Sequence, residues 1–214
     1  MLDMSPIGDE ETFKEVRNYV VDTARTIFEK DKNHSHMFFI VLPGGGLEPC
    51  LFDGLIEECR RYVTKMAKET GRKIEIDADD GQLKDVAFSY LASVIYEKKA
   101  VGYFEVGEGW SVAMDVPGED GPEREGKFLE RFRKVKEMYG GTLKNVPTRF
   151  EILFVRGRWR DKNYMVTWTI GRRDKEVWLQ DFKETEAAFD KEICRASVID
   201  KAIDKVLEEE EKVK

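Results

Sequence analysis

The sequence predicts an α+β fold: a mostly antiparallel sheet, made of hairpins and a C-terminal three-strand meander, with helices packed on it. Segments with apolar residues at helical spacing are interspersed with short apolar or alternating segments that end at Gly, Pro, Asn or Asp. No regular alternation of long buried strands with helices appears, so tight turns join the strands. At 214 residues, we expect a single domain over 1–214.

The first half of the chain reads as helix, hairpin, helix, helix. Apolar residues recur at threes and fours over residues 9–30, which predicts a helix. Two short apolar runs flank a glycine-rich turn at 43–46, which is typical of a β-hairpin. A second helix is expected from an Asp53 cap to Gly71, and a third over 82–98, capped by Asp79 or Asp80, with Val86, Tyr90 and Leu91 on its apolar stripe. A short edge strand is expected at 74–76.

In the second half, two strands, 100–106 and 110–116, are expected around a turn at Gly107-Glu108-Gly109. A Gly/Pro/acid loop at 117–126 and a basic helix within 127–139 are predicted as an insertion. The meander comprises 149–155, 163–170 and 176–182. From Glu184 the chain is expected to be helical, with residues 208–214 frayed.

Charge is distributed unevenly along the chain. Residues 127–175 carry fourteen Lys or Arg against five Asp or Glu, whereas the net charge of the whole chain is −7. An acidic protein with one basic, aromatic-rich segment either neutralises that segment with its own acids or offers it to an anionic partner.

Composition excludes several classes of protein. Cys50, Cys59 and Cys194 are odd in number and form no C-x-x-C pair, which favours free thiols in a reducing compartment. The N-terminus has no signal-peptide pattern, and the longest apolar run, 37–42, is far below the ~20 residues of a membrane helix. We therefore expect a soluble, cytoplasmic protein without a membrane association.

The basic segment supplies the candidate binding site. Arginines lie on the predicted basic helix and at both turns of the meander, with tryptophan beside them, and such residues can hold phosphates and stack bases. The candidate residues are Arg131, Arg133, Arg156, Arg158, Trp159, Arg160, Arg172 and Arg173. The alternative is that these arginines pair with the chain's own acidic helices, which requires no partner.

No catalytic motif is present in the sequence. Only His34 and His36 are available as histidines; they share one side of an extended segment, but no acid lies at a matching local spacing. We therefore expect no metal and no cofactor. A carboxylate- and Mg²⁺-dependent hydrolase using Glu108, Asp115 and Glu151 remains the enzymatic alternative.

The function that this sequence favours is that of a non-enzymatic binding or interaction protein. The alternative binding function is recognition of single-stranded nucleic acid or another polyanion through 127–175. A monomer and a homodimer through the C-terminal helix are both open, because that helix has an apolar stripe near heptad spacing, although a short one.

Two short motifs carry a resemblance. Glu108-x-Trp110 is followed by Arg149-x-Glu151 at the start of a meander that ends in Thr169-Ile170-Gly171-Arg172. The chain resembles a broad group of uncharacterised small prokaryotic and phage proteins with a Glu-x-Trp … Arg-x-Glu pattern. The likeness covers about 10–180 in outline; 53–81 and 117–147 depart from it. It implies a shared α+β fold and no particular activity.

Overall fold

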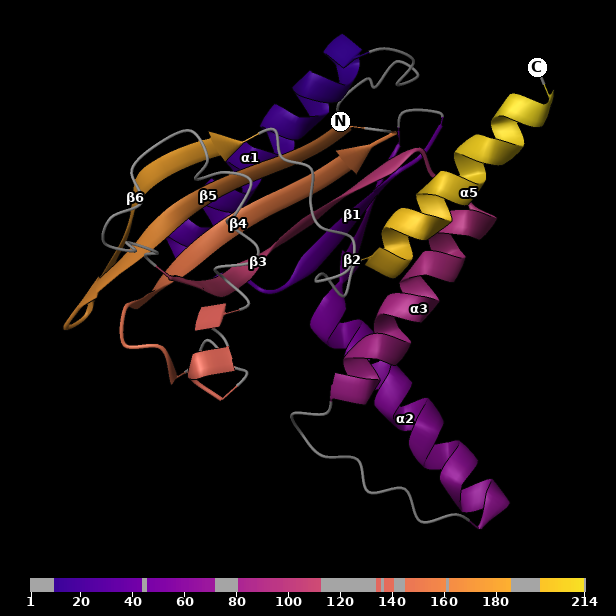
Figure 1. Ribbon diagram of the computed structural model, residues 1–214, viewed down its shortest axis with the longest axis horizontal. Helices are drawn as coiled ribbons and strands as arrows, with labels where there is room; N and C mark the ends of the chain where they lie inside the picture. Colours follow the sequence, from indigo (N-terminus) through magenta and orange to yellow (C-terminus); the bar gives the residue numbers. More distant parts are fainter. Residues whose placement is uncertain are drawn as a thin grey trace.

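The computed structural model describes residues 10–43, 46–71, 81–112, 134–135, 137–140, 145–160, 162–185 and 197–213. Within these ranges the chain forms helices and a single antiparallel sheet of six strands, so the predicted α+β class is confirmed (Figure 1). The elements in chain order are α1 (Glu10–Asp31), β1 (Met37–Val41), β2 (Leu47–Leu51), α2 (Phe52–Thr70), α3 (Gly81–Glu97), β3 (Gly102–Val112), β4 (Arg149–Trp159), β5 (Lys162–Arg173), β6 (Glu176–Thr185) and α5 (Ser197–Val213).

The sheet has the strand order β2-β1-β3-β4-β5-β6, and every neighbouring pair is antiparallel. The predicted β1–β2 hairpin and the β4-β5-β6 meander are therefore both confirmed. The long connection between β2 and β3 contains α2 and α3, and β3 then pairs with β1 from the other side. This arrangement places the charged residues of β3 and β4 at the centre of the sheet.

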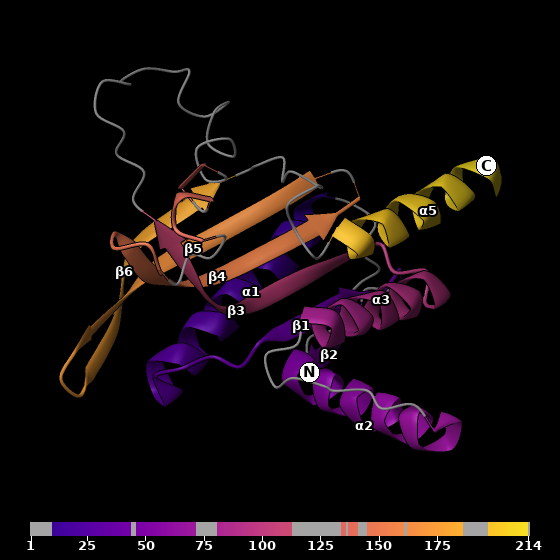
Figure 2. The same ribbon diagram turned by 60° about the horizontal axis from the view of Figure 1, so that its bottom comes forward.

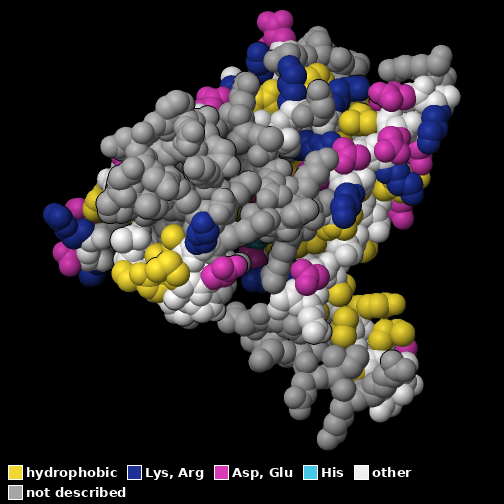
Figure 3. Space-filling model, viewed as in Figure 1, with side chains coloured by type: hydrophobic (Ala, Val, Ile, Leu, Met, Phe, Trp, Pro, Cys, Tyr) yellow, Lys and Arg dark blue, Asp and Glu magenta, His cyan; other side chains and the backbone are white. Residues whose placement is uncertain are grey.

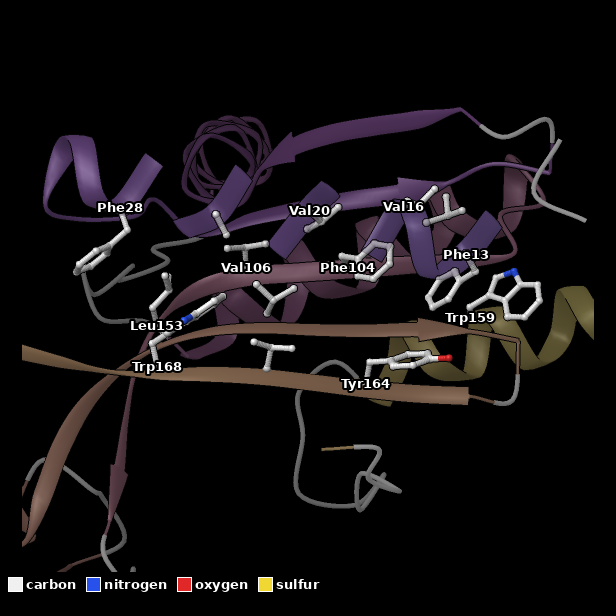
Figure 4. Close-up of a cluster of buried hydrophobic side chains, with 14 of the residues drawn as sticks. Phe13, Val16, Val20, Phe28, Phe104, Val106, Leu153, Trp159, Tyr164 and Trp168 are labelled. Carbon is white, nitrogen blue, oxygen red and sulfur yellow. The ribbon is translucent and has the colours of Figure 1, made fainter. Parts of the chain in front are cut away.

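Helices cover both faces of the sheet. On one face, Phe13, Val16 and Val20 of α1 pack against Phe104 and its neighbours in β3, β4 and β5 (Figure 4). On the other face, α2, α3 and α5 pack against side chains of β1 and against Tyr103 of β3. Successive residues of a strand point to opposite faces, so Tyr103 and Phe104 belong to different cores.

The segment predicted as two strands around a Gly-Glu-Gly turn is instead one continuous strand, β3. Gly107 pairs with Phe154 of β4, and Gly109 also lies against the Phe154 ring. Neither glycine has the positive φ that a tight hairpin turn requires. The glycines make room for an aromatic side chain on the neighbouring strand, and the sequence pattern was misread as a turn.

Two helix predictions were also wrong in detail. Leu51, not Asp53, is the N-cap residue of α2, and no side chain caps it. Asp53 lies in the first turn, where a carboxylate stabilises the helix dipole. The predicted C-cap is confirmed, because Gly71 has φ 66° and its N–H reaches the last carbonyls of α2. Val86 and Tyr90, predicted as part of the buried stripe of α3, are exposed.

The C-terminal region differs from the prediction at both ends. Residues up to Thr185 belong to β6 and not to a helix, and α5 stays helical to Val213 where fraying was expected. The last turns of α5 are held by ion pairs: Glu209 with Lys99 and Glu210 with Arg160. Ile199, Ile203 and Val206 are fully buried within the chain, so this stripe is not available as a dimer seam.

Several expectations lie outside the described residues. These include the edge strand at 74–76, the Asp79 or Asp80 cap of the third helix, the acidic loop at 117–126, most of the basic helix within 127–139, and Cys194. Among the residues that the structure describes, no helix is both long and apolar enough to cross a membrane.

Candidate functional site

Arg156, a predicted binding residue, lies in the interior of the protein. Its Nη2 is 2.9 Å from Glu105 Oε2 on the paired strand β3 and donates to the Tyr103 hydroxyl at 3.0 Å. The arginine is 4% exposed and Glu105 is 7% exposed. A phosphate cannot reach this guanidinium without displacing its carboxylate, so Arg156 is part of the folded structure and not of an open binding surface.

Arg158 is held in the same way by α5. Its Nη1 donates to the Asp200 carbonyl at 2.9 Å and lies 3.6 Å from Asp200 Oδ1, and its Nη2 pairs with Asp204. Arg160, at the β4–β5 turn, lies 3.7 Å from Glu210 near the end of α5. The acidic C-terminal helix thus neutralises the two arginines that follow Arg156 in β4 and its turn.

Trp159 was proposed for base stacking, but it belongs to the core beneath α1. Its ring stacks on Phe13 with centroids 5.1 Å apart, and the residue is 6% exposed. The alternation of β4 explains this position, because Trp159 shares a face with Leu153 and Val155, which contact the same core. It is a packing residue that no ligand can stack on.

The other predicted residues divide into three cases. Arg172 pairs with Glu151 and lies 3.2 Å from Glu108, again within the chain. Arg173 is exposed at the end of β5. Arg131 and Arg133 lie outside the described residues. Acids of the same chain therefore neutralise Arg156, Arg158, Arg160 and Arg172. The binding of a polyanion stays a prediction.

Arg172 is the centre of a surface cluster that unites the two short sequence motifs. Glu108 and Trp110 come from β3, and Arg149 and Glu151 come from β4. Trp110 and Glu151 are direct cross-strand partners, and the Arg149 guanidinium lies over the Trp110 ring, 4.6 Å from its centroid. We call these residues the Trp110 cluster: Glu108, Trp110, Arg149, Glu151 and Arg172.

The Trp110 cluster is accessible and ordered by its own contacts. Trp110 is 42% exposed, which is unusual for so large an apolar side chain on the middle strands of a sheet. Arg172 holds both glutamates with its guanidinium, and Glu108 also accepts the backbone N–H of His34 at 2.6 Å. The cluster carries two acids and two arginines, so it presents a fixed tryptophan in a surface of balanced charge.

The carboxylates of the enzymatic alternative are Glu108, Asp115 and Glu151. Glu108 and Glu151 do converge, but the group between them is the guanidinium of Arg172 and not an open cation position. Asp115, the third predicted carboxylate, lies outside the described residues. Among the described residues, no group of three or more His, Cys, Asp or Glu side chains is placed to hold a metal ion.

The two histidines do not share one site. The His34 backbone N–H binds Glu108, whereas His36 Nε2 lies 2.9 Å from Glu105 Oε1 and its ring packs against Phe52. The acid that orients His36 is 69 positions away in the sequence, which is why local spacing did not reveal it. The signal that could have revealed it is a glutamate inside the apolar run Val101–Val106, because a buried carboxylate needs a cationic partner.

Glu105 belongs to a buried polar network that crosses from the sheet to α5. Burial acts to raise the pKa of Glu105, but the Arg156 charge and the hydrogen bond from His36 outweigh it, so the pKa is lowered. Burial is also the main reason that the pKa of Tyr103 is raised well above its ordinary value, and the Tyr103 hydroxyl donates to Asp200 Oδ1 at 2.9 Å. The lowered pKa keeps Glu105 ionised beside Arg156, and the raised pKa keeps Tyr103 protonated as a hydrogen-bond donor, which is typical of a structural network.

Compared with known protein families, with curated proteins and with solved structures, the chain has no match.

Proposed function

We propose that the protein is a non-enzymatic binding protein that engages a protein or peptide partner at the Trp110 cluster. The single observation that carries this proposal is the exposed Trp110 ring, which projects from a paired strand and is covered on one side by the Arg149 guanidinium. Tryptophan and arginine are the residue types most enriched among the side chains that dominate binding energy in protein interfaces.

The position of Trp110 on a sheet strengthens the argument. Its backbone is paired to β4 through the register with Glu151, so little conformational freedom remains to be lost on binding. A tryptophan that is already rigid contributes more of its buried area to affinity than one on a mobile loop. The surrounding ion pairs of Arg172 add polar groups of both signs at the rim.

Charge favours a protein partner over a nucleic acid at this surface. The glutamates of the cluster, Glu108 and Glu151, are paired with Arg172 and offset the charge of its two arginines, so the cluster has no net positive charge to attract a phosphate backbone. The arginines of 156–160, which would attract one, are already paired with Glu105, Asp200, Asp204 and Glu210. A partner that presents its own mixture of charges around an apolar contact fits better.

The experiment is a selection of binding peptides from a random displayed library on the full chain, with two matched variants. Trp110→Ala removes the proposed anchor. Trp178→Ala removes a tryptophan of similar exposure, 39%, on β6, outside the cluster. We expect selected peptides to lose at least tenfold in affinity for Trp110→Ala and to keep their affinity for Trp178→Ala, because anchor residues contribute about 2 kcal/mol or more.

Two outcomes would count against the proposal. One is a set of peptides that bind wild type and Trp110→Ala equally well. The other is a set whose affinity depends on Trp178, since the binding surface would then lie on the opposite face of the sheet. Circular dichroism of both variants would verify that the fold is kept.

A further inference from the structure

We infer that a face of α2 is a self-association surface, and that its occupant is the α2 of a second copy of the chain, antiparallel to the first. This surface is independent of the Trp110 cluster. It consists of residues spaced four, three, one and three apart along one side of the helix, which we call the α2 stripe: Glu58, Tyr62, Lys65, Met66 and Glu69.

The first observation is exposed apolar area on a projecting helix. Helix α2 extends away from the sheet (Figures 1 and 2). Tyr62 is 65% exposed and Met66 is 39% exposed, and the two lie one turn apart. On the neighbouring helix α3, Val86 and Tyr90 are also one turn apart and exposed.

Figure 3 shows hydrophobic side chains at the surface beside these two helices. Scattered single apolar side chains on a surface need no explanation, but grouped ones mark interaction sites. Here two pairs occur on two helices that pack against each other. The packing within the chain therefore leaves these four apolar side chains exposed.

Charge identifies the occupant. Glu58 and Lys65 are seven residues apart, which is two helical turns, so they lie on the same side of α2 with Tyr62 between them. A two-fold axis that crosses the helix midway between Glu58 and Lys65 places Glu58 of each copy opposite Lys65 of the other. The same axis passes close to Tyr62, which then contacts its symmetry mate.

The stripe is thus complementary to itself, which is what a closed two-fold interface requires. Met66, one turn beyond Tyr62 on the same helix, extends the apolar contact along the stripe. Glu69 lies 3.9 Å from Lys65 within one copy, and it holds the lysine side chain along the stripe. The apolar stripe of α5 cannot serve this role, because Ile199 and Ile203 are fully buried within the chain.

The test is sedimentation equilibrium of the full chain at about 0.15 M salt, the ionic strength at which exposed charge pairs are partly screened. We expect a concentration-dependent monomer–dimer equilibrium. Glu58→Lys and Lys65→Glu each replace two symmetry-related attractive pairs by repulsive ones, and each should weaken the dimer roughly tenfold. The double variant, Glu58→Lys with Lys65→Glu, restores opposite charges and should recover wild-type association.

Lys30→Glu is the matched control. Lys30 is exposed on α1, which packs on the opposite face of the sheet from α2, and its reversal changes the net charge as Lys65→Glu does, so it should leave the dimer intact. Thermal melts monitored by circular dichroism would show that all four variants fold. A wild-type chain that stays monomeric at several hundred micromolar overturns the inference. A double variant that fails to recover, or a control as damaging as Lys65→Glu, overturns it as well.

Discussion

Glu105 Oε2 lies 2.9 Å from Arg156 Nη2 across the paired strands β3 and β4, and both side chains are almost entirely removed from solvent. The two residues are direct cross-strand partners. Arg156 also donates to Tyr103, which donates to Asp200, so this ion pair connects the centre of the sheet to α5. The strand pairing and the docking of the C-terminal helix are therefore coupled through polar contacts.

The Glu105–Arg156 ion pair predicts a large loss of stability when its carboxylate is removed. Glu105→Gln keeps the shape of the side chain but leaves the Arg156 charge buried without its carboxylate. We expect a loss of about 3–5 kcal/mol in the free energy of unfolding, because breaking a buried ion pair from one side leaves an uncompensated charge. Urea unfolding monitored by circular dichroism measures the loss. A change below about 1 kcal/mol, the scale of an exposed pair, would show that solvent reaches Arg156.

A pH dependence follows from the same residue. The pKa of Glu105 is lowered from its ordinary value of 4.5 in the folded protein. A lowered folded pKa gives stability that is present above the unfolded pKa and is lost as the pH falls toward the folded value. The difference in unfolding free energy between wild type and Glu105→Gln should therefore be constant near neutral pH and shrink below pH 4.5. A difference that widens on acidification would contradict the direction of the shift.

The roles of the two tryptophans predict different costs of truncation. Trp159→Ala removes a core ring stacked on Phe13 and should cost about 3–5 kcal/mol in unfolding free energy. Trp110→Ala removes a half-exposed ring that lies beneath the Arg149 guanidinium, and about 1 kcal/mol is expected. Chemical denaturation of both variants in one buffer provides the comparison. Equal losses would place Trp110 in the core and remove the basis for its proposed binding role.

The fold class was predictable because its signals are local. Helical spacing gave α1, α2 and α3, the glycine-rich turn gave the β1–β2 hairpin, and short polar links gave the β4-β5-β6 meander. The position of glycine inside strand β3 could not be predicted from local signals. The role of Gly107 depends on Phe154, which lies on another strand and is 47 positions away, so the local pattern resembled a turn.

The site was less predictable than the fold, for a related reason. The acids that neutralise Arg156 and Arg158 come from β3 and from α5, and only the folded sheet brings them together. The motifs around Glu108 and Arg149 were visible in the sequence, but their union through Arg172 requires the register of three strands. The composition was compatible with internal pairing of the arginines and with an anionic partner, and it could not distinguish between these two alternatives.

Self-neutralisation leads to a prediction about nucleic acids. With Arg156, Arg158, Arg160 and Arg172 paired internally, we expect little binding of single-stranded DNA at about 50 mM salt, where the phosphate contribution is large. Fluorescence anisotropy with a labelled oligonucleotide measures it. Tight binding with a log–log salt slope of about −5, which corresponds to about seven phosphate contacts at ~0.7 each, would support the polyanion alternative. The loss of that binding in an Arg173→Ala variant, which removes an exposed arginine of the predicted set, would assign it to this segment.

The continuity of β3 can be tested at its glycines. A Cβ at Gly102 would lie 2.4 Å from the Arg158 carbonyl oxygen on β4, a contact with rigid backbone, whereas a Cβ at Gly109 would meet the Phe154 ring at 3.5 Å, an ordinary contact distance. Gly102→Ala should therefore destabilise the protein by about 1–3 kcal/mol or more through forced strand displacement. Gly109→Ala should be neutral or slightly stabilising, because alanine reduces the freedom of the unfolded chain at an extended position. If a turn existed at 107–109, alanine at Gly109 would be strained and would lower the melting temperature by several degrees. Because Gly102 lies in a strand in both cases, the Gly109→Ala result is the one that decides between one strand and two.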